Sequence, residues 1–232
     1  MHNYYRPLTG DDFRKDESSI IGVLENIKNR KLSNDLQLLN YYKEVPINFA
    51  AEINLIDQGL LELSVHQLQA ISMQHQKITI LRSEHFAHDV LAKVMKVNKD
   101  KGLAFLTHFS YAQILTDRRK HVRVKISQPM EASIHLSTKT VKGTINDISI
   151  SGIAIQAPKD SDIEENLASR ISLILSGTKF DVPGKVLRVH NNESSREIAI
   201  QMEVDGKNER ALSQFIFQTQ NEIIREMKDQ IY

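Results

Sequence analysis

Apolar and polar residues alternate with a period of two along most of the chain between residues 35 and 204. Successive side chains of a β-strand point to opposite faces, so this alternation is typical of strands that rest one face on a core. Polar turn residues such as Asp57-Gln58-Gly59 separate several of the alternating segments. Many short strands with turns between them predict a mainly β fold of antiparallel barrels or sandwiches.

The alternating segments form two groups, one on each side of a stretch with weak patterning at residues 111–117. The first group comprises residues 35–42, 47–56, 60–65, 77–82, 89–97 and 102–109. The second comprises residues 121–126, 130–136, 142–148, 152–157, 170–175, 181–189 and 197–204. A chain of 232 residues can bury two modest cores. We therefore expect two domains, at residues 1–115 and 116–232.

Three segments have helical spacing instead. A short amphipathic helix is expected from Ser18 or Ser19 onwards, because a serine can cap it and Ile20, Leu24 and Ile27 share one face. Residues 66–74 fit a short helix or an irregular link. An amphipathic helix is expected from about residue 208 to 230, with an apolar stripe at Leu212, Phe215, Ile216, Ile223, Met227 and Ile231. Residues 1–16 are polar and are expected to be loose.

Composition excludes several function classes. The net charge of +1 argues against a general binder of nucleic acids or anionic membranes. The absence of cysteine excludes disulfides, a thiol nucleophile and cysteine-ligated metals. The first residues lack the order of a signal peptide, and no apolar run approaches the roughly 18 residues of a membrane span. We expect a soluble, cytoplasmic protein without membrane insertion.

Four basic residues stand in the six-residue stretch RRKHVR: Arg118, Arg119, Lys120 and Arg123. Arg119 and Arg123 are four residues apart, so they share a face in a helix or in a strand. A guanidinium fork can bond two phosphate oxygens and can also stack on a flat base. The usual fate of such a cluster is a solvated surface, and its spacing alone does not decide between the two interpretations.

A second feature is the stretch NDISISG, residues 146–152. Asp147 and Ser149 fall on one face, and the apolar phase changes after Gly152. Such a change needs a turn or bulge, and we expect Gly152 to supply unusual backbone angles there. A carboxylate can accept two N–H bonds from a guanine edge, as it does from arginine. On its own the stretch is equally typical of a surface strand with a hairpin glycine.

Together, Arg-x-x-x-Arg at 119–123 and Asp-x-Ser-x-x-Gly at 147–152 resemble the signature of the PilZ domain, a family that binds cyclic di-GMP. The segment GKVLRV, with Gly184, Val186 and Arg188, resembles a later strand of that family. The front half is similar to the N-terminal split β-barrel of flagellar-brake (YcgR-type) PilZ proteins. The resemblance thus implies two β-barrel domains with a short N-terminal helix and a C-terminal amphipathic helix.

The resemblance also implies roles for the residues. Arg119 and Arg123 would clamp the phosphates and guanines of cyclic di-GMP, and Arg118 would assist from the linker. Asp147 and Ser149 would read a guanine edge, and Gly152 would hold the turn. Lys120 and Arg188 are secondary candidates. No metal and no cofactor are expected besides this ligand, and one or two ligand molecules are both compatible with the sequence.

The implied function is that of a receptor and not of an enzyme. Ligand binding at the linker would re-orient the two barrels and change contact with a protein partner. By resemblance that partner would be a flagellar motor or switch component, with motility as the output and the flagellar basal body as a place of association. DNA and RNA are not expected as partners.

Two alternatives come from other classes of protein. A split barrel can also host flavin, which would make the chain an oxidoreductase with a regulatory domain, although residues 35–110 show no arginine and serine cluster for the flavin phosphate. The basic stretch RRKHVR can alternatively bind nucleic acid without sequence preference. His85 and His88 lack acidic neighbours at ligand spacing, so we expect no metal site there.

Overall fold

The computed structural model describes residues 4–8, 13–175 and 177–231, and its contacts divide the chain into two compact units. Unit 1 comprises Met1–Tyr42, Pro46–Lys120 and Ile224–Tyr232, and unit 2 comprises Lys43–Val45 and His121–Ile223. Each unit contains one closed six-stranded barrel. The expected fold class, mainly β with two barrels, is therefore confirmed. The domain boundary at residue 115 stays a prediction.

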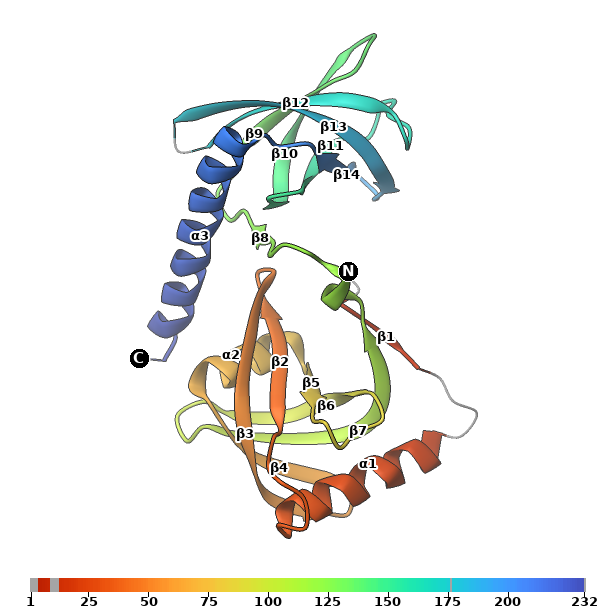
Figure 1. Cartoon of the computed structure of the whole chain (residues 1–232), viewed down its shortest axis with the longest axis vertical. Coiled ribbons are helices and arrows are strands. Elements are labelled where there is room, and N and C mark those ends of the chain that lie inside the picture. Colours follow the sequence, from red (N-terminus) through yellow and green to blue (C-terminus); the bar gives the residue numbers. More distant parts are fainter. Residues whose placement is uncertain (1–3, 9–12, 176, 232) are drawn as a thin grey trace. The chain divides into compact units, whose positions relative to one another are not determined.

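The barrel of unit 1 has the strand order β7, β4, β3, β2, β5, β6, and β6 pairs with β7 to close it (Figure 1). The strands are β2 (Gln37–Tyr42), β3 (Val45–Asp57), β4 (Leu60–Val65), β5 (Ile78–Arg82), β6 (Asp89–Asn98) and β7 (Leu103–Ile114). One short strand, β1 (Tyr5–Pro7), pairs antiparallel with the end of β7. The alternation in the sequence located all of these strands except β1.

Two helices complete this part of unit 1. Helix α1 (Phe13–Lys28) lies beside the barrel, and its Ile20 and Leu24 belong to the same core cluster as Leu106 and Phe109 (Figure 1). Helix α2 (Gln67–Gln76) packs against β2 and β6. The core of unit 1 is thus filled by apolar faces of strands and helices, as the periodicity predicted.

Local chemistry explains why the segment after His66 forms helix α2. The His66 side chain caps α2 by accepting a hydrogen bond from the Leu68 backbone N–H. At the other end Lys77 adopts a left-handed conformation, and its N–H donates to the Met73 carbonyl. Both ends therefore satisfy backbone groups that a short helix leaves open. The irregular link considered from the sequence is not formed.

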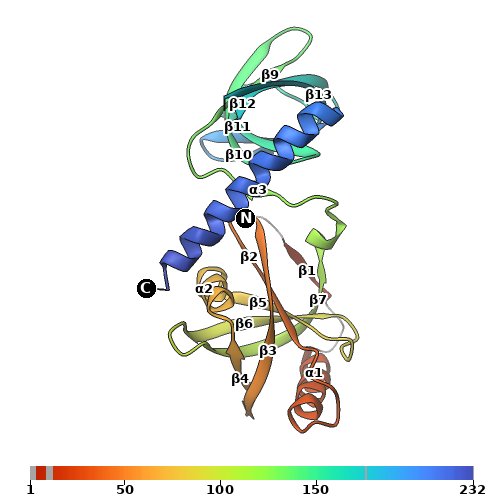
Figure 2. The same cartoon turned by 60° about the vertical axis from the view of Figure 1, so that its left-hand side comes forward.

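The barrel of unit 2 has the strand order β11, β14, β13, β12, β9, β10, with β10 paired to β11. Its strands are labelled in Figure 1, and Figure 2 shows them from another side. The strands are β9 (Glu131–His135), β10 (Thr140–Ser149), β11 (Gly152–Pro158), β12 (Ala168–Leu175), β13 (Thr178–Asn191) and β14 (Ser195–Met202). A two-residue strand, β8 (Val124–Lys125), pairs with β10. The polar end of β10 is therefore flanked by β8 on one side and β11 on the other.

The last element is the long helix α3 (Gly206–Asp229), close to the expected range. Leu212, Ile216, Ile223 and Met227 are buried along it, as expected, whereas Phe215 is only partly buried and Ile231 lies beyond the end of the helix. No helix in the described parts of the chain is long and apolar enough to span a membrane.

Residues 1–16 were expected to be loose, but the structure forms strand β1 and the start of helix α1 within them. Tyr5 pairs with Ile114 and Pro7 with Ala112, and the Leu8 N–H donates to the Tyr111 carbonyl. These backbone hydrogen bonds hold β1 on β7 despite its polar sequence. Helix α1 also begins five residues before Ser18. Residues 1–3 and 9–12, to which the expectation also applied, lie outside the described residues.

Candidate functional site

Two polar residues, Asp147 and Ser149, are buried near the end of β10. Asp147 is 3% exposed and Ser149 is 4% exposed. Both lie on the face opposite to Ile148, which is fully buried. The alternation predicts this shared face, but it does not indicate that the face is covered. A buried carboxylate is tolerated when charges or hydrogen bonds compensate for the lost water.

Arg123 supplies a charge for this carboxylate. It directly precedes β8, which pairs antiparallel with β10 so that Lys125 lies opposite Asp147. The Arg123 Nη1 lies 3.9 Å from the Asp147 Oδ1, and the two side chains are 38% and 4% exposed. This distance is that of an ion pair and is too long for a direct hydrogen bond. The site therefore combines an accessible guanidinium with a buried carboxylate.

Gly152 has a role that differs from the expected one. Its backbone does not adopt a positive φ, so the expectation of unusual backbone angles is wrong. A Cβ at this position would lie 3.1 Å from the Ile200 carbonyl oxygen of β14, so close approach of strands favours glycine. The Ser149 hydroxyl donates to the Gly152 carbonyl at 3.1 Å. The register shift of this hairpin lies upstream, between Ile145 and Asp147.

Arg119 belongs to unit 1 and follows the short 3₁₀ turn η1 (Leu115–Arg118). Its backbone N–H donates to the Thr116 carbonyl at 2.9 Å. Its Cζ lies 6.0 Å from the centroid of the Tyr4 ring. Tyr4 in turn stacks on Tyr41, with centroids 4.6 Å apart and rings 1° from parallel. The first arginine of the pair thus lies over two stacked aromatic rings.

Three further residues were predicted for the site: Arg118, Lys120 and Arg188. The Arg118 backbone ends η1, and its side chain lies outside the described residues. Lys120 is exposed and is the last residue of that part of unit 1. Arg188 is exposed on β13, opposite Ala199 of β14. The structure therefore brings Arg123, Asp147, Ser149 and Gly152 together, and it describes Arg119 in unit 1.

Sequence reasoning missed three neighbours of the basic stretch. Tyr4 and Tyr41 lie beneath Arg119, and their signal was the aromatic character of two Tyr-Tyr pairs in otherwise polar or alternating segments. Lys43, within unit 2, accepts a hydrogen bond from the Lys125 N–H at its carbonyl and donates from Nζ to Ser127. No signal in the sequence places Lys43 beside β8, because its place depends on tertiary structure.

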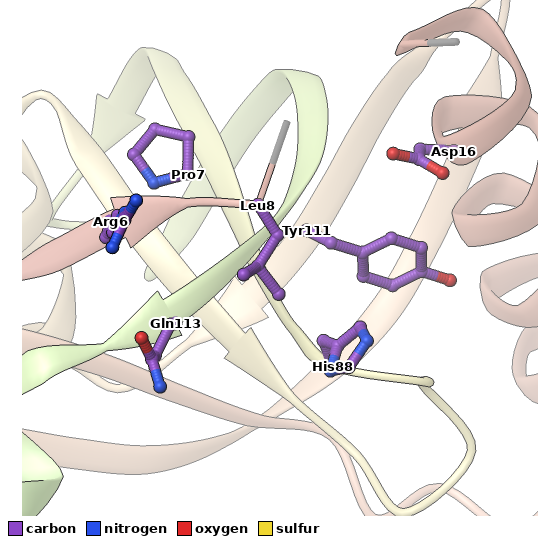
Figure 3. A pocket seen from close by; sticks show the side chains of 7 residues that line it. All are labelled: Arg6, Pro7, Leu8, Asp16, His88, Tyr111 and Gln113. Atoms are coloured by element: carbon purple, nitrogen blue, oxygen red, sulfur yellow. The ribbon is translucent and has the colours of Figure 1, made fainter. Parts of the chain in front are cut away.

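A separate pocket of about 520 Å³ lies in unit 1. It is lined by Arg6, Pro7, Leu8, Asp16, His88, Tyr111 and Gln113 (Figure 3). The Tyr111 ring projects between β7 and α1. The His88 ring lies edge-on to it, with the two ring centroids 5.7 Å apart. One arginine and one aspartate line this pocket, which is a poor donor set for the phosphate of a flavin. Among the described residues, no cluster of three or more His, Asp or Glu could hold a metal ion.

One family model matches the C-terminal part of the chain. Residues 117–218 match the family model described as PilZ domain. This range contains both arginines of the pair and the whole of the Asp147–Gly152 signature. No curated protein is similar enough to the chain to count as a relative.

Several solved structures are similar to the chain over most of its length. YcgR from Escherichia coli in complex with c-di-GMP is 15% identical, covers 94% of this chain and 96% of its own, and has a TM-score of 0.46. MotI from Bacillus subtilis is 14% identical, covers 82% and 97%, and has a TM-score of 0.43. The c-di-GMP complex of K. pneumonia MrkH is 13% identical, covers 92% and 98%, and has a TM-score of 0.47. At these values the likeness says nothing about function.

Proposed function

Because residues 117–218 match the PilZ domain, we propose that the chain is a receptor for cyclic di-GMP that passes ligand binding on to a protein partner. The observation that carries the proposal is the placement of Arg123 3.9 Å from the buried Asp147, beside Ser149, within the matched range. In this proposal the chain is a binding protein and not an enzyme.

The chemistry of the ligand suits these groups. Cyclic di-GMP carries two phosphates and two guanines, and a guanidinium fork bonds phosphate oxygens in pairs. The Asp147 carboxylate can accept two N–H groups from the edge of a guanine. Four to six such charge-assisted contacts, less the cost of ordering the chain, are consistent with an affinity on the order of micromolar or better.

We further propose that binding changes the arrangement of the two units. Arg119 belongs to unit 1 and Arg123 to unit 2, and only three residues separate them. A ligand that draws both guanidinium groups onto its phosphates would favour one arrangement of the units. Such a shift requires that the ligand bind one arrangement more tightly than another. X-ray scattering with and without ligand tests this step, and identical profiles would argue against re-orientation.

The partner in this proposal is a protein, with flagellar motor or switch components as the first candidates and reduced motility as the output. Co-precipitation with purified switch components, with and without ligand, tests it. A ligand-independent result would separate the partner from the receptor function. The proposal places the protein in the cytoplasm, with association at the flagellar basal body.

Calorimetric titration of cyclic di-GMP into the wild type and the Arg119→Ala variant tests the receptor function. We expect saturable heat with the wild type and loss of most of it in the variant. Arg210→Ala is a matched control, because Arg210 is an exposed arginine of α3 outside the signature. Absence of heat from the wild type with about 50 µM ligand would refute the proposal, since that concentration detects micromolar binding.

The same preparation separates the two alternatives. A flavoprotein would show flavin absorbance after purification, whereas a c-di-GMP receptor would be colourless. Binding of nucleic acid through RRKHVR would weaken steeply as salt is raised and would tolerate any sequence. A compact dinucleotide site would instead keep c-di-GMP bound in the presence of excess DNA or RNA.

A further inference from the structure

The backbone that leads to Arg119 is fixed to the aromatic pair Tyr4–Tyr41 at several points. The Leu115 N–H donates to the Tyr4 carbonyl at 2.9 Å. The hydroxyl groups of Tyr41 and Thr116 are hydrogen-bonded to each other, and both residues are less than 10% exposed. The η1 turn is therefore attached to this pair by its backbone and by a buried side chain.

The Arg119 side chain meets the same pair. Its guanidinium lies over the face of Tyr4, whose ring lies parallel to that of Tyr41. At 6.0 Å from the ring centroid, the charge is within the range of a cation–π contact. Tyr4, Tyr41, Thr116 and Arg119 all belong to unit 1. This arrangement is thus a property of one compact unit.

A cation–π contact of this kind does not compete with phosphate for the guanidinium. It depends on the charge of the cation and the face of the ring, and it consumes none of the N–H donors that bind phosphate. A mobile arginine side chain loses conformational entropy when a ligand immobilises it, and this loss lowers affinity. A ring that restricts Arg119 before the ligand arrives removes part of this cost from binding.

We infer that Tyr4, supported by Tyr41, is a positioning residue that orients Arg119 for the phosphate of an anionic dinucleotide. The inference rests on the proposed c-di-GMP function and extends it to the N-terminal segment. Because β1 pairs with β7, the segment that follows Tyr4 is held on the barrel by backbone hydrogen bonds. Residues far from the basic stretch in sequence therefore contribute to ligand affinity.

Calorimetry of c-di-GMP binding to Tyr4→Leu and Tyr4→Phe variants of the full chain tests the inference. Leucine keeps an apolar side chain but removes the aromatic face, whereas phenylalanine keeps the face and removes only the hydroxyl. We expect affinity to fall about two- to fivefold in Tyr4→Leu, as for the loss of an exposed cation–π contact, and to be retained in Tyr4→Phe. Melting temperatures measured without ligand show whether either variant is unfolded.

The outcomes distinguish this inference from the function on which it rests. If the wild type binds and Tyr4→Leu binds equally well, the positioning role is overturned and the receptor function stands. Tighter binding by Tyr4→Leu overturns it as well, because Tyr4 would then restrain Arg119 from the ligand. An equal loss in Tyr4→Phe would point to the hydroxyl instead of the ring face and would also overturn it. Failure of the wild type to bind removes both proposals.

Discussion

The Arg123 Nη1 lies 3.9 Å from the Asp147 Oδ1, and the arginine is more than a third exposed while the aspartate is almost fully buried. The two side chains therefore differ in how easily a ligand reaches them. Water and ligands reach the guanidinium, whereas the carboxylate depends on its neighbours for compensation. A ligand that offers phosphate to Arg123 and N–H donors to Asp147 compensates both charges at once. Cyclic di-GMP has both kinds of group.

Asp147→Asn tests the carboxylate. The substitution keeps the shape of the side chain but removes its charge and replaces one acceptor oxygen by a donor. Hydrogen bonds to charged groups contribute about 1.5–3 kcal/mol, so we expect affinity for c-di-GMP to fall at least about tenfold by calorimetry. Asp181→Asn is the control, since Asp181 lies on β13 and its side chain is 48% exposed. Affinity within twofold of the wild type for Asp147→Asn would exclude a guanine-reading role.

Gly152→Ala tests the close approach of β14 to the hairpin. The new Cβ would lie 3.1 Å from the Ile200 carbonyl oxygen, which belongs to a paired strand and cannot rotate away. We expect a loss of about 1–3 kcal/mol in the stability of unit 2, as for other overpacked sites. Calorimetric melting should show a decrease of several degrees, since about 1 kcal/mol corresponds to roughly 4–8 °C in a unit of this size.

Gly206→Ala is the matched control for this experiment. A Cβ at Gly206 would meet nothing within 4 Å, and the residue begins helix α3, where alanine is favoured over glycine. We expect its melting temperature to equal or exceed that of the wild type. If Gly152→Ala melted like Gly206→Ala, the close approach would not be the reason for glycine at this position.

Much of the fold was predictable because the barrel strands bury one face and leave the other polar. The strand β1 was not, since three polar-flanked residues carry no periodicity and their place is set by backbone pairing with β7. Helix α2 was ambiguous for a related reason. Its hydrophobic pattern is weak, because Gln69 and Ser72 are buried along with its apolar residues.

The site was predictable in its residue types and less so in its environment. Spacing placed Asp147 and Ser149 on one face, but only tertiary packing decides that this face is buried. The role of Gly152 depends on the distance to Ile200, which lies 48 positions later in the chain. Tyr4 contacts Arg119, which lies 115 positions later in the chain. None of these relationships leaves a periodic signal in the sequence.

Asn40 is the centre of a buried polar network in unit 1, and its replacement by leucine tests that network. Its amide nitrogen donates to the Ile78 carbonyl and to Gln76, and its oxygen accepts from the Thr79 hydroxyl, each at 2.7 Å. Asn40 is 1% exposed and Thr79 is fully buried. A buried donor or acceptor that loses its hydrogen-bond partner costs about 1–3 kcal/mol. We therefore expect Asn40→Leu, which leaves the Thr79 hydroxyl without this partner, to lower the stability of unit 1 by at least that amount.

A second substitution makes the Asn40 experiment specific. Thr79→Val in the Asn40→Leu background removes the hydroxyl that has lost its partner, so we expect it to restore part of the stability measured by urea unfolding. An additive or larger loss in the double variant would show that the hydroxyl finds another partner. The cost of Asn40→Leu would then come from packing and from the groups of Ile78 and Gln76 that Asn40 donates to, and not from the Thr79 hydroxyl.

The pH dependence of stability should report on Asp35, which precedes β2 in unit 1. Burial favours a higher pKa for this carboxyl, but hydrogen bonds from the Ser83 hydroxyl and the Glu84 N–H, together with the charge of His85, outweigh burial and lower its pKa below the ordinary 3.8. A lowered pKa in the folded state means that the ionised form stabilises the fold above pH 3.8, and that this contribution is lost as pH falls through the folded pKa.

Urea unfolding of the wild type and Asp35→Asn across this range measures the contribution. The variant lacks the titrating group but can still accept one of the two hydrogen bonds. We expect the wild type to be more stable above pH 3.8 and the difference to shrink as the pH is lowered further, because protonation then removes the wild-type advantage. Asp160→Asn is the control, since Asp160 is an exposed residue of unit 2. A constant difference between wild type and Asp35→Asn at every pH would show that ionisation of Asp35 does not contribute to stability.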